Sequence, residues 1–231
     1  MYAKYLKRMF DFIISVTALF VLSPVLLILM IVGAFMMKGN PFFVQPRPGR
    51  KGKDGKEKLF YIIKFRTMSN AKDKNGNLLP DEQRLGRYGA WMRSTSLDEI
   101  PELLNIVAGD LALCGPRPFL VRDMVFMTDE QRRRHDVRPG LTGLAQVNGR
   151  NNITWERKME YDLQYIDDGI TFMGDLKIAF RTVFKVIERS DTVREGTVTD
   201  IDYGDWLLLE GKVDQNTYDK KQDEARELLG V

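Results

Sequence analysis

The feature that most constrains this chain is an uncharged apolar run near its N-terminus. No charged residue occurs between Phe12 and Met37. At about 1.5 Å per helical residue, such a run is long enough to cross a bilayer core of about 30 Å. The alternative is a buried core helix of a soluble protein, which is rarely this long. We therefore predict a membrane-inserted helix.

Two features of this run predict an unusual path through the membrane. Ser23-Pro24 stands at its middle, and proline removes a backbone donor and crowds the preceding turn, so the helix should bend or break there. Both flanks are basic, with Lys4, Lys7 and Arg8 on one side and Lys38, Arg47, Arg50, Lys51 and Lys53 on the other. Basic flanks favour the cytoplasmic side. A re-entrant helix that enters and leaves by one face satisfies both observations.

Charge and metal-binding residues narrow the partners of the remaining chain. Residues 200–231 hold nine acids and four bases, so the net charge of +3 becomes +8 for residues 1–199. A basic body favours an anionic partner: phosphate groups, a lipid surface or nucleic acid. One cysteine, Cys114, and one histidine, His135, exclude an internal disulfide and a Cys- or His-rich metal site. Any metal held by carboxylates and phosphates should be Mg²⁺ or Mn²⁺.

Hydrophobic patterning predicts an α+β fold that is mainly helical. Residues 42–45 and 59–65 read as strands of a β-hairpin, with Asp54-Gly55 in its turn, and residues 69–83 as a polar surface loop. Helices are predicted at residues 97–107, 128–135, 155–166 and 175–189. The acidic segment after residue 200 is expected to be a small appended helix or partly disordered.

The helix predicted at residues 175–189 is strongly amphipathic. Its apolar stripe consists of Leu176, Ala179, Phe180, Val183, Phe184 and Ile187. Lys177, Arg181 and Lys185 lie four apart on another face. The pattern fits a helix on an anionic membrane surface and equally a core helix with a solvated basic face. The nearby membrane segment favours the membrane surface.

The segment from Arg93 to Glu102 carries the residues best suited to chemistry. Ser96 and Glu99 match a capping box, which puts Asp98 and Glu99 in the first turn of a helix. The structural explanation is that two acids complement the helix dipole. The functional explanation is that Asp98 is an ionised nucleophile and Glu99 holds a divalent cation that bridges substrate phosphates.

Several arginines stand in turns rich in proline and glycine. Arg93 precedes the acidic pair, and Arg117, Arg138 and Arg150 follow it in Gly-Pro-Arg-Pro, Val-Arg-Pro-Gly and Asn-Gly-Arg contexts. Arginine gives planar, two-pronged contacts to phosphate oxygens. Together these segments predict a site built for a diphosphate.

With these motifs, the sequence resembles the bacterial sugar transferase family, the monotopic polyprenyl-phosphate phosphoglycosyl transferases of the small single-domain type. The resemblance covers residues 1 to about 199. Its motifs are Lys7-Arg8, Phe10-Asp11, Ser23-Pro24, Gln45 to Gly49, Lys64 to Met68, Arg93 to Glu99, Gly115 to Pro118, Arg138 to Gly143, Ala145 to Arg150 and Asp175 to Lys177. Leu144 departs from the tryptophan often found after Thr-Gly in this family.

The resemblance implies a reaction and an organisation. Asp98 would attack the sugar-bearing phosphate of a UDP-sugar, form a covalent aspartyl phosphosugar intermediate and release UMP. Polyprenyl phosphate, such as undecaprenyl phosphate, would then take the sugar-1-phosphate. Glu99 would bind Mg²⁺. Substrate-binding roles would fall to Arg93, Arg117, Arg150, Lys64, Arg66 and Arg138.

The same resemblance divides the chain into a re-entrant membrane helix (1–39), a catalytic domain on the cytoplasmic face of the bacterial inner membrane (40–199) and an acidic extension of open role (200–231). The expected partners are a UDP-sugar, polyprenyl phosphate and membrane lipid, without nucleic acid, and a homodimer is compatible with the sequence. The alternatives are a membrane-anchored phosphodiesterase and a non-catalytic scaffold. The sequence does not name the sugar.

Overall fold

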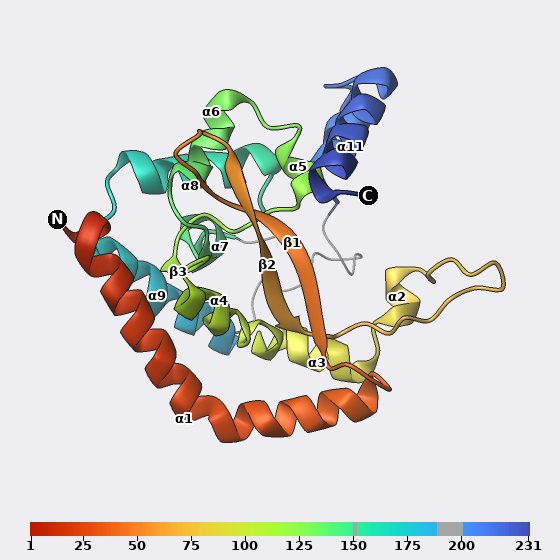
Figure 1. Cartoon of the computed structure of the whole chain (residues 1–231), viewed down its shortest axis with the longest axis horizontal. Helices are drawn as coiled ribbons and strands as arrows, with labels where there is room; N and C mark the ends of the chain where they lie inside the picture. Colours follow the sequence, from red (N-terminus) through yellow and green to blue (C-terminus); the bar gives the residue numbers. More distant parts are fainter. Residues whose placement is uncertain (150–151, 189–200) are drawn as a thin grey trace.

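A computed structural model describes residues 1–149, 152–188 and 201–231, and it is mainly helical (Figure 1). A long antiparallel hairpin runs through the middle of the molecule, made of β1 (Phe42–Lys51) and β2 (Glu57–Phe65). A short parallel pair joins β3 (Ala112–Cys114) to β4 (Gly140–Thr142). The mainly helical α+β class and the hairpin are confirmed, although β1 extends beyond the predicted strand.

The apolar run forms one long helix, α1 (Lys7–Met36), after a π-helical turn η1 (Tyr2–Leu6). Figure 1 shows that α1 is bent near its middle, and Pro24 lies inside it. The helical assignment continues through Ser23 and Pro24, so the expected break is a bend without an interruption. Pro24 cannot donate to the carbonyl of Phe20, and Ser23 Oγ donates to that carbonyl at 2.7 Å instead. The serine therefore satisfies the acceptor that the proline leaves free.

Polar contacts fix the first turns of α1 to the rest of the molecule. Lys7 Nζ lies 2.6 Å from Asp175 Oδ2, and the hydroxyl of Tyr2 donates to the same oxygen at 2.7 Å. Arg8 donates to the carbonyls of Ile106 and Val107, the latter at 2.8 Å. These contacts join α1 to α9 (Phe172–Glu188) and to α4 (Glu102–Ala108).

The hydrophobic core that positions the site lies between β2 and α4. Its buried members are Phe60, Ile62, Leu103, Ile106 and Leu111. The buried side chain of Asn105 pins the helix to the strand, because its amide donates to the carbonyl of Tyr61 at 2.8 Å and its oxygen accepts from the amide of Ile63 at 3.0 Å. The end of β2 is thereby held beside the start of α4.

The remaining predictions are mostly confirmed. Residues 128–135 form α6 (Asp129–Arg132) and η3 (Arg133–Asp136), and residues 155–166 form α8 (Trp155–Asp167). The polar loop ends in a short helix, α2 (Asp81–Arg84). The other short helices are α3 (Arg87–Ser94), α5 (Val121–Met124) and α7 (Leu144–Val147).

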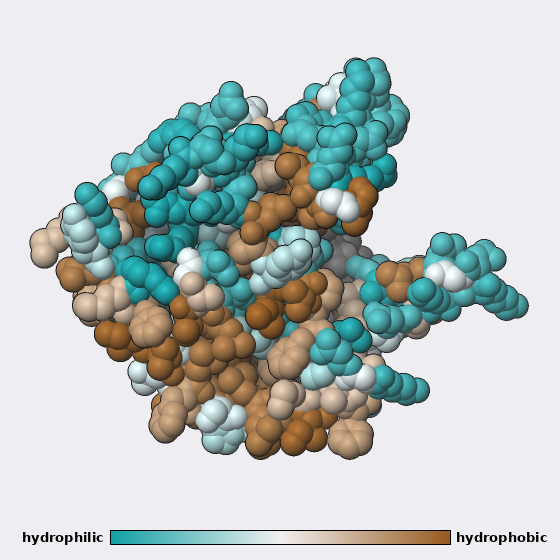
Figure 2. Space-filling model, viewed as in Figure 1, coloured by the Kyte–Doolittle hydropathy of each residue, from teal (hydrophilic) through white to brown (hydrophobic). Residues whose placement is uncertain are grey.

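The apolar stripe of α9 is exposed. Leu176, Phe180, Val183 and Phe184 are each about half exposed or more, so the interpretation of α9 as a core helix along this stripe is wrong. Phe172 at its start packs on Phe10 of α1, with ring centroids 5.7 Å apart. Hydrophobic side chains also gather over α1 in Figure 2, away from the hydrophilic upper face. Arg181 is not on a free basic face, because it donates to the carbonyl of Val147 and to Asn148 Oδ1.

The acidic extension forms two helices, α10 (Tyr203–Leu209) and α11 (Gln215–Leu229). Tyr203 and Leu207 of α10 are buried against Met127, Trp155 and Met159. Ala225 of α11 is buried against α5. The extension is therefore packed onto the body.

Candidate active site

Asp98 and Glu99 lie in a short 3-10 turn, η2 (Leu97–Glu99), between α3 and α4. Ser96 before it has left-handed backbone angles (φ 54°, ψ 19°), and its side chain makes no capping hydrogen bond. The predicted capping box is therefore wrong, and the predicted helix at residues 97–107 is split. A left-handed non-glycine residue costs about 1–2 kcal/mol, and such strain collects at functional sites. Because Glu99 does not cap a helix, its carboxylate can bind other side chains.

Glu99 is held by two cations. Lys64 Nζ at the end of β2 lies 2.8 Å from Glu99 Oε1, and Arg117 Nη2 forms an ion pair with the same oxygen. Burial by itself raises the pKa of Glu99, but Arg117 and Lys64 lower it to well below its ordinary value. Glu99 is consequently a fixed anion at neutral pH.

Asp98 is in a different state from its neighbour. In the described ranges its carboxylate makes no hydrogen bond and no ion pair. Burial, and next the charge of Glu99, raise the pKa of Asp98 from 3.8 to about 6, although Lys64, Arg93 and Arg117 oppose the shift. At pH 7 most of the population remains ionised. A half-buried anion without hydrogen-bond donors among the described residues, with cations nearby, is suited to nucleophilic attack on a phosphate.

Arg93 is fixed beside Asp98 by the packing of α3. Gly89 lets this helix approach the segment after β2, because a Cβ there would lie 1.8 Å from the carbonyl oxygen of Thr67. Arg93 Nε donates to Thr67 Oγ1 at 3.0 Å. Burial lowers the pKa of Arg93, and the negative charge of Asp98 raises it. The guanidinium is thus held close enough to Asp98 to act on the same phosphate.

The loop that carries Arg117 is braced from behind. Arg134 is almost fully buried, and it donates to the carbonyl of Arg117 and to Asp162 Oδ2 at 2.6 Å. Its guanidinium carbon also lies 3.9 Å from the centroid of the Phe119 ring. Phe119 packs edge-on against Trp155 with centroids 4.9 Å apart. The backbone around Arg117 is therefore set by buried contacts.

Two residues of this site were not among the predicted site residues. Glu102, on the first turn of α4, is buried with Oε1 3.0 Å from Lys64 Nζ. Arg47 of β1 donates to the carbonyl of Pro118 at 3.2 Å, and burial, with the charge of Arg117, lowers its pKa to about 10. The i, i+3 spacing of Glu99 and Glu102 was a usable signal, whereas nothing local indicates Arg47.

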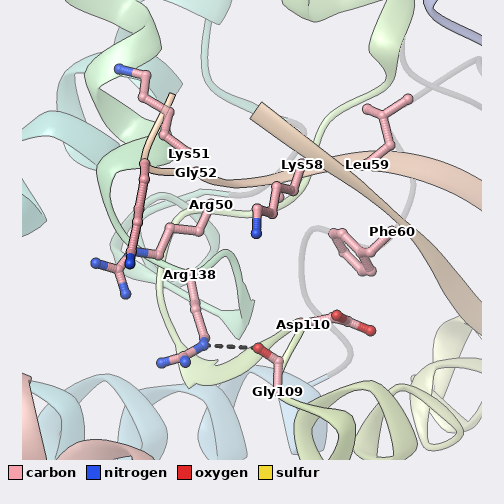
Figure 3. A pocket seen from close by; sticks show the side chains of 11 residues that line it. Arg50, Lys51, Gly52, Lys58, Leu59, Phe60, Gly109, Asp110 and Arg138 are labelled. Atoms are coloured by element: carbon pink, nitrogen blue, oxygen red, sulfur yellow. Dashed lines mark hydrogen bonds between the residues drawn. The ribbon is translucent and has the colours of Figure 1, made fainter. Parts of the chain in front are cut away.

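Two predicted substrate-binding residues are not bonded to the acidic pair. Arg138 lies at the opposite end of α4, where Nε donates to the carbonyl of Gly109 at 2.8 Å (Figure 3). Arg66 makes no hydrogen bond or ion pair to Asp98 or Glu99. A third, Arg150, lies outside the described residues. Among the described residues, Lys64, Arg93 and Arg117 are the predicted cations that the fold brings together with Asp98 and Glu99.

An apolar groove of about 280 Å³ lies next to this cluster. It is lined by Leu19, Ser23, Leu26, Leu27 and Met30 of α1, by Phe42 and Phe65, and by Pro101 and Leu104. Pro101 follows Glu99 by two residues, and Phe65 follows Lys64 directly. The bend of α1 therefore places an apolar surface next to the charged site.

Within the described ranges, no three His, Cys, Asp or Glu side chains are grouped to hold a metal ion. The carboxylates in the site belong to Asp98, Glu99 and Glu102, of which Glu102 is buried against Lys64. Mg²⁺ commonly binds one or two carboxylates together with substrate phosphates and water. The site fits that mode and does not fit a cage of protein ligands.

The chain was compared with known proteins. The model of the family described as "Bacterial sugar transferase" matches residues 2–189, so α10 and α11 lie outside the match. "Uncharacterized sugar transferase EpsL" of Bacillus subtilis (strain 168) is 46% identical over 79% of this chain and 87% of its own length. "Exopolysaccharide production protein ExoY" of Sinorhizobium fredii (strain NBRC 101917 / NGR234) is 33% identical over 77% of this chain and 83% of its own length. "UDP-glucose:undecaprenyl-phosphate glucose-1-phosphate transferase" of Klebsiella pneumoniae is 39% identical over 78% of this chain, which spans only 39% of that protein.

Proposed function

This chain belongs to the bacterial sugar transferase family, and on that premise we propose that it transfers a sugar-1-phosphate from a UDP-sugar to a polyprenyl phosphate such as undecaprenyl phosphate. The observation that carries the proposal is the contrast between the two neighbouring acids. Glu99 is bound by Lys64 and Arg117, whereas Asp98 is half-buried and bonded to neither. One acid is built to stay in place and the other to react.

In the first step Asp98 Oδ attacks the phosphorus that carries the sugar. The bond between that phosphorus and the oxygen of UMP breaks, and UMP leaves with the electron pair. Arg93 and Arg117 hold oxygens of the diphosphate and neutralise its charge, which is the main catalytic need in phosphoryl transfer. The product of this step is an aspartyl phosphosugar.

In the second step an oxygen of polyprenyl phosphate attacks the same phosphorus, and the Asp98 carboxylate leaves. The product is a polyprenyl diphosphate sugar. The groove between α1 and Pro101 supports this step, since it offers an apolar surface for the first isoprenyl units within two residues of Glu99. The acceptor phosphate would then lie at the charged end of the groove.

Mg²⁺ would be held by Glu99 together with phosphate oxygens of the donor, and it would supply further charge neutralisation. We place the enzyme on the bacterial inner membrane with its charged site on the cytoplasmic face. The basic flanks of α1 and the exposed apolar surfaces of α1 and α9 support this arrangement, in which α1 is re-entrant and α9 lies on the membrane surface.

The test is a single-turnover experiment without acceptor lipid. Purified full-length protein in detergent is incubated with Mg²⁺ and a panel of UDP-sugars, and intact mass and UMP are measured together. The expected result is a gain in mass equal to one phosphosugar with one equivalent of UMP for one donor. The panel includes UDP-glucose and UDP-galactose, because both sugars occur in the names of related proteins.

Two variants sharpen the test. Asp98→Asn should lose both signals, and Asp168→Asn, an exposed acid at the end of α8, should keep both. Turnover of donor and acceptor by Asp98→Asn at the wild-type rate would exclude the covalent role. Release of UMP and free sugar phosphate without any need for acceptor would identify a phosphodiesterase instead.

A further inference from the structure

A basic cavity, distinct from the apolar groove described above, lies at the end of α4 that is far from Asp98. It has a volume of about 650 Å³ and opens between the turn of the β-hairpin, the segment after α4 and the loop before β4 (Figure 3). The buried side chains of Phe60, Ile62, Leu103 and Ile106 fill the space between this cavity and the acidic pair. The cavity is therefore separate from the transfer site.

The lining of this cavity is strongly cationic. It contains the five cations Arg50, Lys51, Lys53, Lys58 and Arg138 and a single acid, Asp110, so its formal charge is +4. In Figure 3 the side chains of Lys58 and Arg138 point down toward the level of Gly109, that of Arg50 extends to the left, away from Lys58, and the Asp110 carboxylate points to the right, away from all three. Like charges that line one cavity repel one another, and an anion bound in that cavity reduces the repulsion.

Several of these five cations have no side-chain partner among the described residues. Lys51 pairs with Asp136 at 2.8 Å, and Arg138 Nε donates to the carbonyl of Gly109. Within residues 1–149, 152–188 and 201–231, Arg50 and Lys58 form neither a hydrogen bond nor an ion pair. Burial, followed by the charges of Arg8 and Arg50, lowers the pKa of Arg138, and the charges of Asp11 and Asp110 oppose the shift.

The backbone makes room for these side chains. A Cβ at Gly52 would lie 2.6 Å from Asp54 Oδ1 and 3.0 Å from Lys58 Cε, so the stem of Lys58 folds over the glycine into the cavity. Gly109 forms the floor on the other side. A Cβ there would lie 3.3 Å from Arg8 Nη2, which belongs to the second residue of α1.

The contact with Arg8 places the cavity at the membrane surface. Arg8 stands four residues before the uncharged run that begins at Phe12, and basic residues at such a boundary lie at the level of lipid headgroups. The exposed phenylalanines of α9 start beside the same end of α1. A phosphate group reaching this cavity from the headgroup layer would meet the cations that line it.

We propose that this cavity binds the phosphate of an anionic phospholipid headgroup, and that it does so independently of the transfer reaction. A phospholipid headgroup and free phosphate would both present phosphate oxygens to two or three cations of this cavity. We favour the lipid because the cavity lies beside Arg8, at the level expected for headgroups. Arginine and lysine together suit this ligand, since the guanidinium gives two-pronged contacts and the ammonium a point charge.

The test measures binding to full-length protein in neutral detergent, without nucleotide-sugar. The probes are dihexanoyl-phosphatidylglycerol, dihexanoyl-phosphatidylcholine and inorganic phosphate, titrated calorimetrically. The cavity variant is Arg50→Gln/Lys58→Gln. The control is Lys72→Gln/Lys74→Gln, which removes the same charge from two exposed lysines of the polar loop. Thermal unfolding checks that both variants are folded, which is expected because all four side chains are exposed.

The expected result is that wild type and control bind phosphatidylglycerol about tenfold or more tightly than phosphatidylcholine, and that the cavity variant loses about that factor. Equal weakening in the control would overturn the proposal, because the effect would then be one of net charge. Unchanged binding in the folded cavity variant would overturn it too. Inorganic phosphate binding as tightly as phosphatidylglycerol would show a free-phosphate site and refute the assignment to lipid.

Discussion

The unusual environment of Asp98 leads to a prediction about stability as well as activity. The ordinary pKa of 3.8 becomes about 6 in the folded protein, because burial and Glu99 disfavour the charged form. At about 1.4 kcal/mol for each pH unit, this difference corresponds to about 3 kcal/mol. Ionised Asp98 thus destabilises the folded state, and Asp98→Asn, which cannot ionise, should be more stable than wild type while inactive.

The sign and the pH range follow from linkage. The folded state binds the Asp98 proton more tightly than the unfolded state, so wild-type stability falls as pH rises from about 4 to about 6 and then levels off. The advantage of Asp98→Asn should be near zero at pH 4, about half its full value at pH 5 and about 3 kcal/mol at pH 8. At roughly 2–4 °C per kcal/mol for a chain of this size, the midpoint difference at pH 8 is about 6–12 °C.

The assay is thermal unfolding of both proteins in the same detergent at pH 5 and pH 8, followed by circular dichroism. Asp168→Asn is the control, and its difference from wild type should not change with pH in this way. A variant that is equally or less stable than wild type at pH 8, or whose advantage is the same at both pH values, would refute the assignment of a buried, strained charge to Asp98.

Four further outcomes are expected. Glu99→Gln should lower the free energy of unfolding by about 3–5 kcal/mol, because it leaves two cations without their shared partner. This change is opposite in sign to that of Asp98→Asn, and the same unfolding assay measures it. The rate of UMP release should rise with pH through an apparent pKa of about 6, as Asp98 loses its proton, and a flat profile between pH 5 and 8 would contradict this. Pro24→Leu should straighten α1 and move residue 1 across the membrane, which a cysteine-accessibility reporter at that end detects. Tyr203→Ala should cost about 3 kcal/mol, because it empties a buried position against Trp155, and it should slow turnover; unchanged unfolding would show that α10 is not needed.

Local patterns were enough to predict the hairpin and the longer helices α8 and α9. The turn chemistry of Asp54-Gly55 and the strand-like runs on either side fixed the hairpin, and the period of α9 fixed that helix. The pattern was insufficient at η2, because Ser96 and Glu99 carry the residue types of a capping box while the backbone of Ser96 is left-handed. In the fold Glu99 is bound by Lys64 and Arg117, which are distant in the sequence, and the spacing of Ser96 and Glu99 does not contain those contacts.

The arginines show the same limit. Arg117 and Arg138 both stand beside proline and glycine in the sequence, Arg93 precedes the acidic pair, and each was predicted to bind the substrate. The fold sends the first two to Asp98 and the third to the opposite end of α4. Chain connectivity and packing decide which end of a helix a distant loop reaches. The residue type therefore predicted that these arginines can bind phosphate, but it could not predict which site each of them lines.

The aromatic stack behind the Arg117 loop has a consequence for the order in which the protein is made. Trp155 packs on Phe119 and on Tyr203, and its indole nitrogen donates to the carbonyl of Ile201 at 3.1 Å. During synthesis α1 emerges early and can enter the membrane long before residue 203 leaves the ribosome. The α10 side of this aromatic stack is therefore completed only after α1, Asp98 and the Arg117 loop have all been synthesised.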